Sequence, residues 1–262
     1  MVNALAQMEG TPVLIIGDMV ADVYLDGEIA RISREAPVLV LEEREERVVA
    51  GGAANVANNA ATIGGSSYAV GVCGTERSGD ALLAVLGENG VHTEGFVRAE
   101  AHPTITKTRI IAGGRATVSQ QIVRVDREWH TPLTAETEEA LLARIRELLP
   151  QVRGVVLSDY GSGTVTEHVR RLVIEETRRA GIPSIVDSRY DILSYEGIGY
   201  VKQNDAELAA ALGRELHSEE EIHAAGHELR ARLGADGVLI TRGDKGMTLF
   251  LADGTATNIP VS

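Results

Sequence analysis

Two carboxylates follow the first apolar run of this 262-residue sequence. The run Val13–Ile16 ends at Gly17, and Asp18 and Asp22 come shortly after it. Side chains just past the carboxyl ends of strands line the ligand crevice of an open α/β sheet, so either Asp18 or Asp22 is placed to accept hydrogen bonds from substrate hydroxyls. The structural alternative is a turn in which Asp bonds its own backbone.

A glycine pair precedes a segment rich in Ala and Asn. Gly51 and Gly52 let a ligand approach the backbone closely, and the first N–H groups of the following helix are natural partners for hydroxyls or anions. Asn55, one turn into that helix, offers both a donor and an acceptor, which suits a sugar diol. Tight helix–sheet packing through small residues is the alternative.

Two later segments suit a nucleotide. Asn204 and Glu207 stand three apart after an extended run, where a carboxylate is able to order the waters around Mg²⁺. An N-cap with its capping box is the structural alternative. Thr241–Gly246 is a glycine-containing turn able to bring N–H groups to a phosphate, and it is equally compatible with a hairpin.

The elements that must position these residues alternate between strand and helix. Thr134–Leu149 has helical spacing, and Ser218 with Glu221 forms a capping box that opens another helix. The buried parallel strands that we expect are Val13–Ile16, Val70–Val72, Val155–Leu157, Ile185–Val186 and Val238–Ile240. This rhythm predicts a doubly wound α/β domain. Residues 23–49 and 104–126 hold extended segments without helices. They predict either a small second sheet that acts as a lid or a pair of exposed hairpins.

Composition excludes several classes of function. Lysine and arginine number 25 against 38 acidic residues, and the net charge of −13 repels nucleic acid at long range. No apolar run is long enough for a membrane span or a signal peptide, and the single cysteine, Cys73, excludes a disulfide framework. We expect a cytoplasmic protein that binds neither nucleic acid nor membrane.

Common nucleotide signatures fail. There is no Walker P-loop motif. Gly161-Ser162-Gly163 after a strand, with Asp187 ending the next one, imitates a dinucleotide-binding unit, but the third glycine position holds Thr166 and Asp159 would place a negative charge beside the pyrophosphate.

Taken in order, the four segments resemble the ribokinase-like (PfkB) carbohydrate kinases over essentially the whole chain, residues 1–262. The most specific part is Ala50–Gly74, which fits the first signature of the family. Arg31–Pro37 is similar to the heptose 7-phosphate kinase subgroup, and Ser158–Gly161 and Thr241–Met247 add support. The resemblance implies a three-layer α/β/α fold with a small β-sheet lid, and ATP-dependent phosphoryl transfer to a sugar or sugar phosphate with Mg²⁺.

The resemblance also implies roles for individual residues. The sugar-binding candidates are Asp18, Asp22, Gly51, Gly52 and Asn55, with Asp159 bordering the cleft and Lys107, Arg109 and Arg124 as candidates for a sugar phosphate. The candidates for ATP are Asp187, Lys202, Asn204, Glu207, Thr241, Gly243 and Gly246, with Glu207 holding Mg²⁺ through water. The lid sheet implies a homodimer contact.

One departure concerns the second family signature, an Asp-Thr/Val-x-Gly-Ala-Gly-Asp run that supplies the anion hole and the catalytic Asp. It is expected shortly after Ser262, where this sequence stops. A general base contributes ~10²–10⁴-fold and an oxyanion donor ~10²–10³-fold. We therefore expect no catalytic base within residues 1–262, and for this polypeptide sugar binding with little turnover. The competing hypotheses are a non-catalytic carbohydrate-binding or regulatory relative and a dinucleotide-dependent enzyme.

Overall fold

The computed structural model describes residues 8–114, 117–129 and 131–261. Its main feature is an eight-stranded sheet with the order β14-β13-β12-β11-β10-β9-β1-β4. The strands are β1 (Pro12–Gly17), β4 (Ser66–Val70), β9 (Gly154–Asp159), β10 (Ser184–Ser188), β11 (Tyr200–Asn204), β12 (Gly237–Thr241), β13 (Met247–Leu251) and β14 (Ala256–Ile259). Strands β4 to β12 in this order are parallel, whereas β13 and β14 are antiparallel additions at one edge.

The strand order reverses beside β1. From β1 the chain moves to β4 on one side, and it later returns to β9 on the other side. In doubly wound sheets, ligands bind in the crevice outside the carboxyl ends of the strands at such a switch point. The fold therefore places Gly17 and Ser158, which are paired at the ends of β1 and β9, at the expected ligand crevice.

Helices cover both faces of the sheet. They are α2 (Ala53–Thr62), α3 (Arg77–Glu88), α4 (Ala135–Leu148), α5 (Glu167–Ala180), α6 (Asp205–Leu212) and α7 (Glu219–Leu233). The predicted capping box of Ser218 with Glu221 is confirmed at α7, and the structure adds Thr134 as the cap of α4. Both caps satisfy N–H groups that a helix start otherwise leaves unpaired.

Two hydrophobic cores show how the layers are divided. One core joins α4, α5, α6 and α7 to one face of the sheet, through side chains such as Leu14 and Val186. The other joins α2 and α3 to the opposite face through Ile15, and it extends only over the β1, β4 and β9 side. On that opposite face of β10, β12 and β13, Ile185, Leu239 and Leu249 are half-buried and belong to neither core. The predicted three-layer α/β/α arrangement is present.

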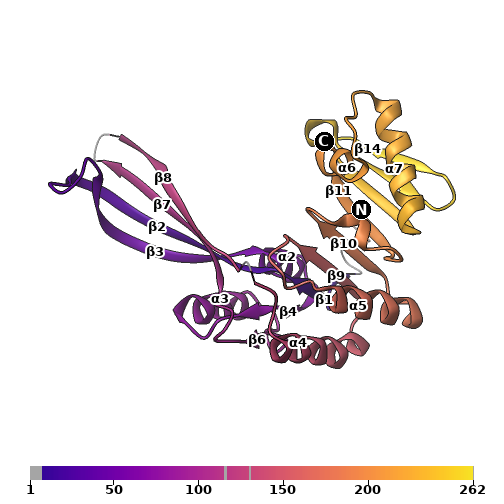
Figure 1. Cartoon of the computed structure of the whole chain (residues 1–262), viewed down its shortest axis with the longest axis horizontal. Helices are drawn as coiled ribbons and strands as arrows, with labels where there is room; N and C mark the ends of the chain where they lie inside the picture. Colours follow the sequence, from indigo (N-terminus) through magenta and orange to yellow (C-terminus); the bar gives the residue numbers. More distant parts are fainter. Residues whose placement is uncertain (1–7, 115–116, 130, 262) are drawn as a thin grey trace.

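A second, four-stranded sheet projects from the main body, as Figure 1 shows. Its strands, in spatial order, are β3 (Leu39–Gly52), β2 (Met19–Ile32), β7 (Ile105–Gly114) and β8 (Thr117–Arg127). We call this the projecting sheet. Residues 23–49 and 104–126, which predict a small second sheet or exposed hairpins, contribute to the projecting sheet. Its strand β2 begins directly after Asp18. No helix in the described ranges is long and apolar enough to cross a membrane.

One strand expectation is wrong. Val70–Val72 is not a single strand, because β4 ends at Val70 and the short strand β5 (Val72–Cys73) pairs instead with β6 (Val97–Arg98). Gly71 lies between them, against the Gly17 carbonyl and the Met19 side chain, and leaves no room for a Cβ. The continuous apolar run hid this break, because periodicity does not distinguish one buried strand from two.

Candidate functional site

The carboxyl ends of β1, β9, β10, β11 and β12 form one edge, where most of the predicted segments meet. Register fixes their alignment: Ser188 pairs with Asp159, Asp187 with Lys202, and Asn204 with Thr241. Parallel neighbours end side by side, so residues distant in sequence become a continuous polar edge. We call this the strand-end edge. The residues predicted to bind sugar lie near β1 and those predicted to bind nucleotide lie near β12, and we name the two halves, the sugar half and the nucleotide half, after these predictions.

The glycine turn and Asp22 lie directly against each other. Strands β2 and β3 pair Met19 with Gly52 and Val20 with Gly51. A Cβ on Gly51 would stand 2.7 Å from Oδ2 of Asp22, and Gly52 has a φ of 55°. Only glycine fits both positions. The structure thus brings together the acidic strand end and the small-residue turn that the sequence singled out.

Helix α2 begins at this turn without a side-chain cap, although the N–H of its first residue, Ala53, bonds to the Asp18 carbonyl at 3.0 Å. Its N-cap Gly52 supplies no side-chain hydrogen bond, and its first turn has no acidic residue. Asn55 is exposed one turn into the helix. The positive end of the helix dipole therefore remains available to a hydroxyl or an anion beside Asp22.

The three predicted phosphate-binding cations share one face of the projecting sheet with Asp22. Register places Lys107 beside Asp22 and Arg109 opposite Arg124. Each cation contacts a carboxylate: Arg109 Nη1 lies 2.6 Å from Asp22 Oδ1, and Lys107 Nζ lies 2.6 Å from Glu128 Oε1. The Asp22 carboxylate raises the pKa of Arg109.

Arg124 forms a two-point contact with Asp126 at 2.9 Å through each of two nitrogens. Asp126 also lies 3.5 Å from Lys107, and these cations lower its pKa although the little burial that it has acts in the opposite direction. A sugar phosphate would have to replace these carboxylates as the partner of the cations. Phosphate binding at this face would therefore exchange one partner for another rather than fill a purely positive site.

Asp18 does not present its carboxylate to a ligand. It is fully buried, and its two oxygens accept hydrogen bonds from the backbone N–H groups of Tyr160, Ser162 and Thr164, at 2.8, 3.1 and 3.0 Å. Burial raises the pKa of this carboxyl, while the three N–H donors act in the opposite direction. The expectation that Asp18 holds sugar hydroxyls does not fit this geometry, because its hydrogen bonds tie two loops together. The sequence showed a carboxylate at a strand end, but it did not show that the N–H groups of a distant loop donate hydrogen bonds to that carboxylate.

Asp159 is buried as well. Its Oδ2 accepts hydrogen bonds from the hydroxyls of Ser188 and Tyr195, at 2.8 and 2.6 Å, and its Oδ1 accepts the Gly161 N–H at 2.9 Å. Burial and the Asp159 charge raise the pKa of Tyr195. Asp159 thus joins the segments that carry Gly161, Ser188 and Tyr195 at the strand-end edge. No local pattern in the sequence indicates that Ser188 and Tyr195 donate hydrogen bonds to Asp159.

On the nucleotide half, the structure joins predicted residues in pairs. Lys202 Nζ lies 2.9 Å from Asp187 Oδ2. Asn204 and Glu207 form a reciprocal capping box at the start of α6, with hydrogen bonds of 2.7 and 2.8 Å. The structural alternative, an N-cap with its capping box, is therefore present, and Glu207 accepts the Asn204 N–H through Oε2.

Thr241–Gly246 connects the antiparallel strands β12 and β13, so it is the hairpin that the sequence allowed. Gly243 and Gly246 have φ values of 57° and 81°. Thr241 lies level with Asn204, its register partner. A hollow of about 230 Å³ next to this half is lined by Ser188, Gln203 and Glu207, among others.

Comparison with known proteins identifies the family. The model of the pfkB family of carbohydrate kinases matches residues 11–261. The chain belongs to the pfkB family of carbohydrate kinases.

Curated relatives of this pfkB chain are named bifunctional protein HldE. The one from Mesorhizobium japonicum is 36% identical over 252 residues, 96% of this chain and 50% of its own length. The one from Geobacter metallireducens is 37% identical over 248 residues, 94% of this chain and 50% of its own. The chain spans about half the length of these relatives.

Solved structures of kinases share the fold. Ribokinase from Arabidopsis thaliana, complexed with ribose and ATP, superposes with a TM-score of 0.67 at 20% identity, covering 97% of this chain and 78% of that one. Phosphofructokinase-2 from Escherichia coli, in complex with fructose-6-phosphate, gives 0.74 at 21% identity, covering 97% and 80%. The predicted ribokinase-like fold is confirmed.

The dinucleotide hypothesis is not favoured for this pfkB chain. The N–H groups of the turn after β9 bond to carboxylates of the chain itself, through Asp18 for Ser162 and Asp159 for Gly161. A pyrophosphate needs those N–H groups free. The two glycines, with φ of 77° at Gly161 and 104° at Gly163, serve this folded turn.

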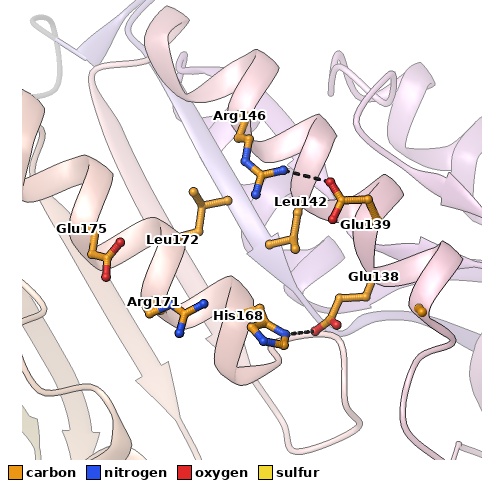
Figure 2. A pocket seen from close by; sticks show the side chains of 9 residues that line it. Glu138, Glu139, Leu142, Arg146, His168, Arg171, Leu172 and Glu175 are labelled. Carbon is orange, nitrogen blue, oxygen red and sulfur yellow. Dashed lines mark hydrogen bonds and ion pairs between the residues drawn. The ribbon is translucent and has the colours of Figure 1, made fainter.

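A pocket of about 420 Å³ between α4 and α5 contains none of the predicted site residues. Figure 2 shows its charged lining, in which Glu139 pairs with Arg146 and Glu138 with His168. Within the described residues, no group of three or more His, Cys, Asp or Glu side chains is arranged to hold a metal ion.

The capping role of Asn204 leads to a first prediction. We expect Asn204→Ala to lower the free energy of unfolding by about 1 kcal/mol, because the cap of α6 is lost, whereas Asn204→Ser retains a capping oxygen. Thermal unfolding of both variants measures this difference. If Asn204 also serves ATP, as the family resemblance implies, nucleotide affinity falls in both variants; equal affinity in Asn204→Ser and the parent chain limits Asn204 to capping.

Proposed function

We propose that this chain carries the sugar and nucleotide sites for ATP-dependent phosphoryl transfer to a hydroxyl of a sugar phosphate, with a heptose 7-phosphate as the substrate. The observation that carries the proposal is the contact of Gly51 with Asp22 beside a cationic face of the projecting sheet. Membership of a carbohydrate kinase family and relatives named HldE support it.

Each part of the substrate has a partner of matching chemistry on the sugar half. Asp22 accepts hydroxyl protons in hydrogen bonds, while Gly51 and Gly52 allow close approach and Asn55 donates and accepts. Lys107, Arg109 and Arg124 exchange their carboxylate partners for the existing phosphate, whose extra charge and three acceptor oxygens favour the exchange. Asp159 holds the loop beneath the sugar.

The nucleotide half offers partners for ATP and Mg²⁺. Asn204, Glu207, Thr241 and Gly243 border this half, and the Lys202–Asp187 pair and Gly246 adjoin it. Glu207 uses Oε2 for its capping box, and this hydrogen bond leaves Oε1 for a metal-bound water. Because Mg²⁺ keeps several waters, a single carboxylate contact of this kind fits it. When bound, Mg²⁺ would neutralise charge on the transferring phosphate. An ATP-dependent kinase needs a supply of ATP, so we propose that the protein acts in the cytoplasm.

Calorimetric titration with D-glycero-D-manno-heptose 7-phosphate, and with the same heptose lacking the phosphate, tests the substrate. We expect the phosphorylated sugar to bind at least about tenfold more tightly, because charge-assisted hydrogen bonds contribute about 1.5–3 kcal/mol. Because no catalytic base is expected within residues 1–262, we expect only slow transfer from labelled ATP to the heptose phosphate. Equal affinity for both sugars would contradict the phosphate site, and sugar binding without ATP binding would favour a non-catalytic carbohydrate-binding relative.

The second face of the projecting sheet supports a homodimer. Val123 and Val125 of β8 alternate with Arg124, so they point away from the cationic face, and they are 45% and 55% exposed. Exposed apolar side chains in a sheet favour association with a second copy. We expect the double variant Val123→Glu, Val125→Glu to shift the protein from dimer to monomer in light scattering. A parent chain that is already monomeric at high concentration would contradict the dimer.

A further inference from the structure

Asp18 makes hydrogen bonds to three different parts of the sugar half. Its N–H donates to the Ser158 carbonyl at 3.1 Å, and its own carbonyl accepts the N–H of Ala53, the first residue of α2, at 3.0 Å. Its carboxylate accepts the N–H groups of residues 160, 162 and 164. A single residue at the switch point therefore fixes β9, the start of α2 and the loop after β9.

The three loop donors alternate along the chain. Tyr160, Ser162 and Thr164 direct their N–H groups to Asp18, while Gly161 and Gly163 between them are exposed. The Gly161 N–H bonds to Asp159. The carboxylate thus turns every second peptide of residues 160–164 inward and leaves the intervening glycine backbone open on the outer side. We call residues 160–164 the anchored loop.

The arrangement is best satisfied by an ionised carboxylate. Three N–H donors need three lone pairs on two oxygens, and an ionised carboxylate offers about four. An Asn side chain in the same place offers one carbonyl oxygen and an NH₂ group that would face an N–H donor. A buried N–H left without an acceptor costs about 1–3 kcal/mol, so the loop would move rather than keep this conformation.

The glycine turn depends on the same residue. A Cβ on Gly52 would stand 2.5 Å from the Asp18 carbonyl oxygen, so Gly52 packs directly on the Asp18 backbone. Gly51, next to it, contacts Asp22. The anchored loop and the glycine turn thus contact two different groups of Asp18, its carboxylate and its backbone carbonyl, so the spacing between them depends on this residue.

We propose that Asp18 is a positioning residue that fixes the anchored loop and the glycine turn to the end of β1 and so sets their spacing at the proposed sugar site. This inference rests on the proposed sugar site but not on the identity of the sugar. It predicts that loss of the carboxylate weakens sugar binding although Asp18 contacts no sugar atom. The nucleotide half, on β11 and β12, has no hydrogen bond to Asp18 and keeps its affinity.

The test compares Asp18→Asn with the parent chain at a temperature where both are folded, as judged by circular dichroism. We expect heptose 7-phosphate affinity to fall at least about tenfold and ADP affinity to change less than about twofold, both by calorimetry. We also expect amide hydrogen exchange at residues 160, 162 and 164 to accelerate at least about tenfold. Asp18→Glu, which keeps the charge, restores part of the exchange protection.

Leu141→Ala is the control for a general loss of stability. Leu141 is fully buried in α4, outside the sugar site, and its truncation lowers the unfolding temperature without altering the anchored loop. Sugar affinity that falls equally in Leu141→Ala and Asp18→Asn would overturn the positioning role. So would unchanged sugar affinity with accelerated exchange in Asp18→Asn. If the parent chain binds ADP and no sugar phosphate, the proposed substrate is wrong, while the exchange measurement still tests the anchored loop.

Discussion

Replacing Asp22 by Ala is expected to lower the affinity for the sugar phosphate by about 5- to 150-fold. The Asp22 carboxylate lies 2.7 Å from where a Cβ on Gly51 would be and 2.6 Å from Arg109, and it is half-buried, so it remains accessible as an acceptor in the sugar half, whereas Asp18 is fully buried. The range corresponds to about 1–3 kcal/mol for hydrogen bonds lost from a partly buried site. Calorimetric titration with heptose 7-phosphate measures it, and circular dichroism verifies that the variant is folded.

Asp26→Ala is the matched control for this prediction. Asp26 lies four residues further along β2, on the same face, and its carboxylate lies 3.8 Å from Arg47. Its removal takes away one negative charge from the same sheet without touching the glycine turn. If both variants lose affinity equally, the effect is one of overall charge, and Asp22 has no direct contact with the sugar. Asp22→Asn keeps an acceptor oxygen, so we expect a smaller loss than in Asp22→Ala.

The sequence predicted the positions of the polar residues better than their roles. Strand ends, capping residues and glycine pairs are local signals, and they located Asp18, Asn204 and the Gly51–Gly52 turn correctly in the fold. The partner of a buried carboxylate is a tertiary contact, however. Residues 142 to 146 positions away supply the N–H donors to Asp18, and no local pattern announces them. One cue was available, because a turn with two glycines beside a strand end needs acceptors for its N–H groups.

The same reason applies to the cations of the projecting sheet. The positive charge of Lys107, Arg109 and Arg124 makes them candidates for phosphate binding, and a sequence shows charge directly. Their pairing with Glu128, Asp22 and Asp126 follows from the register of three strands, which depends on β-bulges that the sequence does not mark. The half-buried face of Ile185, Leu239 and Leu249 also became visible only from the arrangement of the helices.

The largest loss of stability is expected for Gly17→Ala. Gly17 ends β1 and pairs with Ser158 of β9, and a Cβ there would overlap the Ser158 carbonyl oxygen and press on the Ala53 side chain. A clash with backbone is not relieved by a rotamer change, so β1 and β9 must separate at the switch point. Overpacking costs typically about 1–3 kcal/mol and occasionally more. We expect at least about 3 kcal/mol here, measured by urea unfolding, with sugar binding lost together with the geometry of Asp18.

Gly87→Ala provides the comparison that isolates the clash from the general effect of adding a methyl group. Gly87 is an exposed position near the end of α3, and a Cβ there meets no atom within 4 Å. Alanine is the better helix former by about 1 kcal/mol, so this substitution should stabilise the protein. Opposite signs for the two variants support steric contact at Gly17 as the cause. If Gly17→Ala leaves the stability unchanged, β1 and β9 are not packed as closely as the structure has them. The hydrogen bonds of Asp18 to the anchored loop, which depend on this packing, would then be contradicted as well.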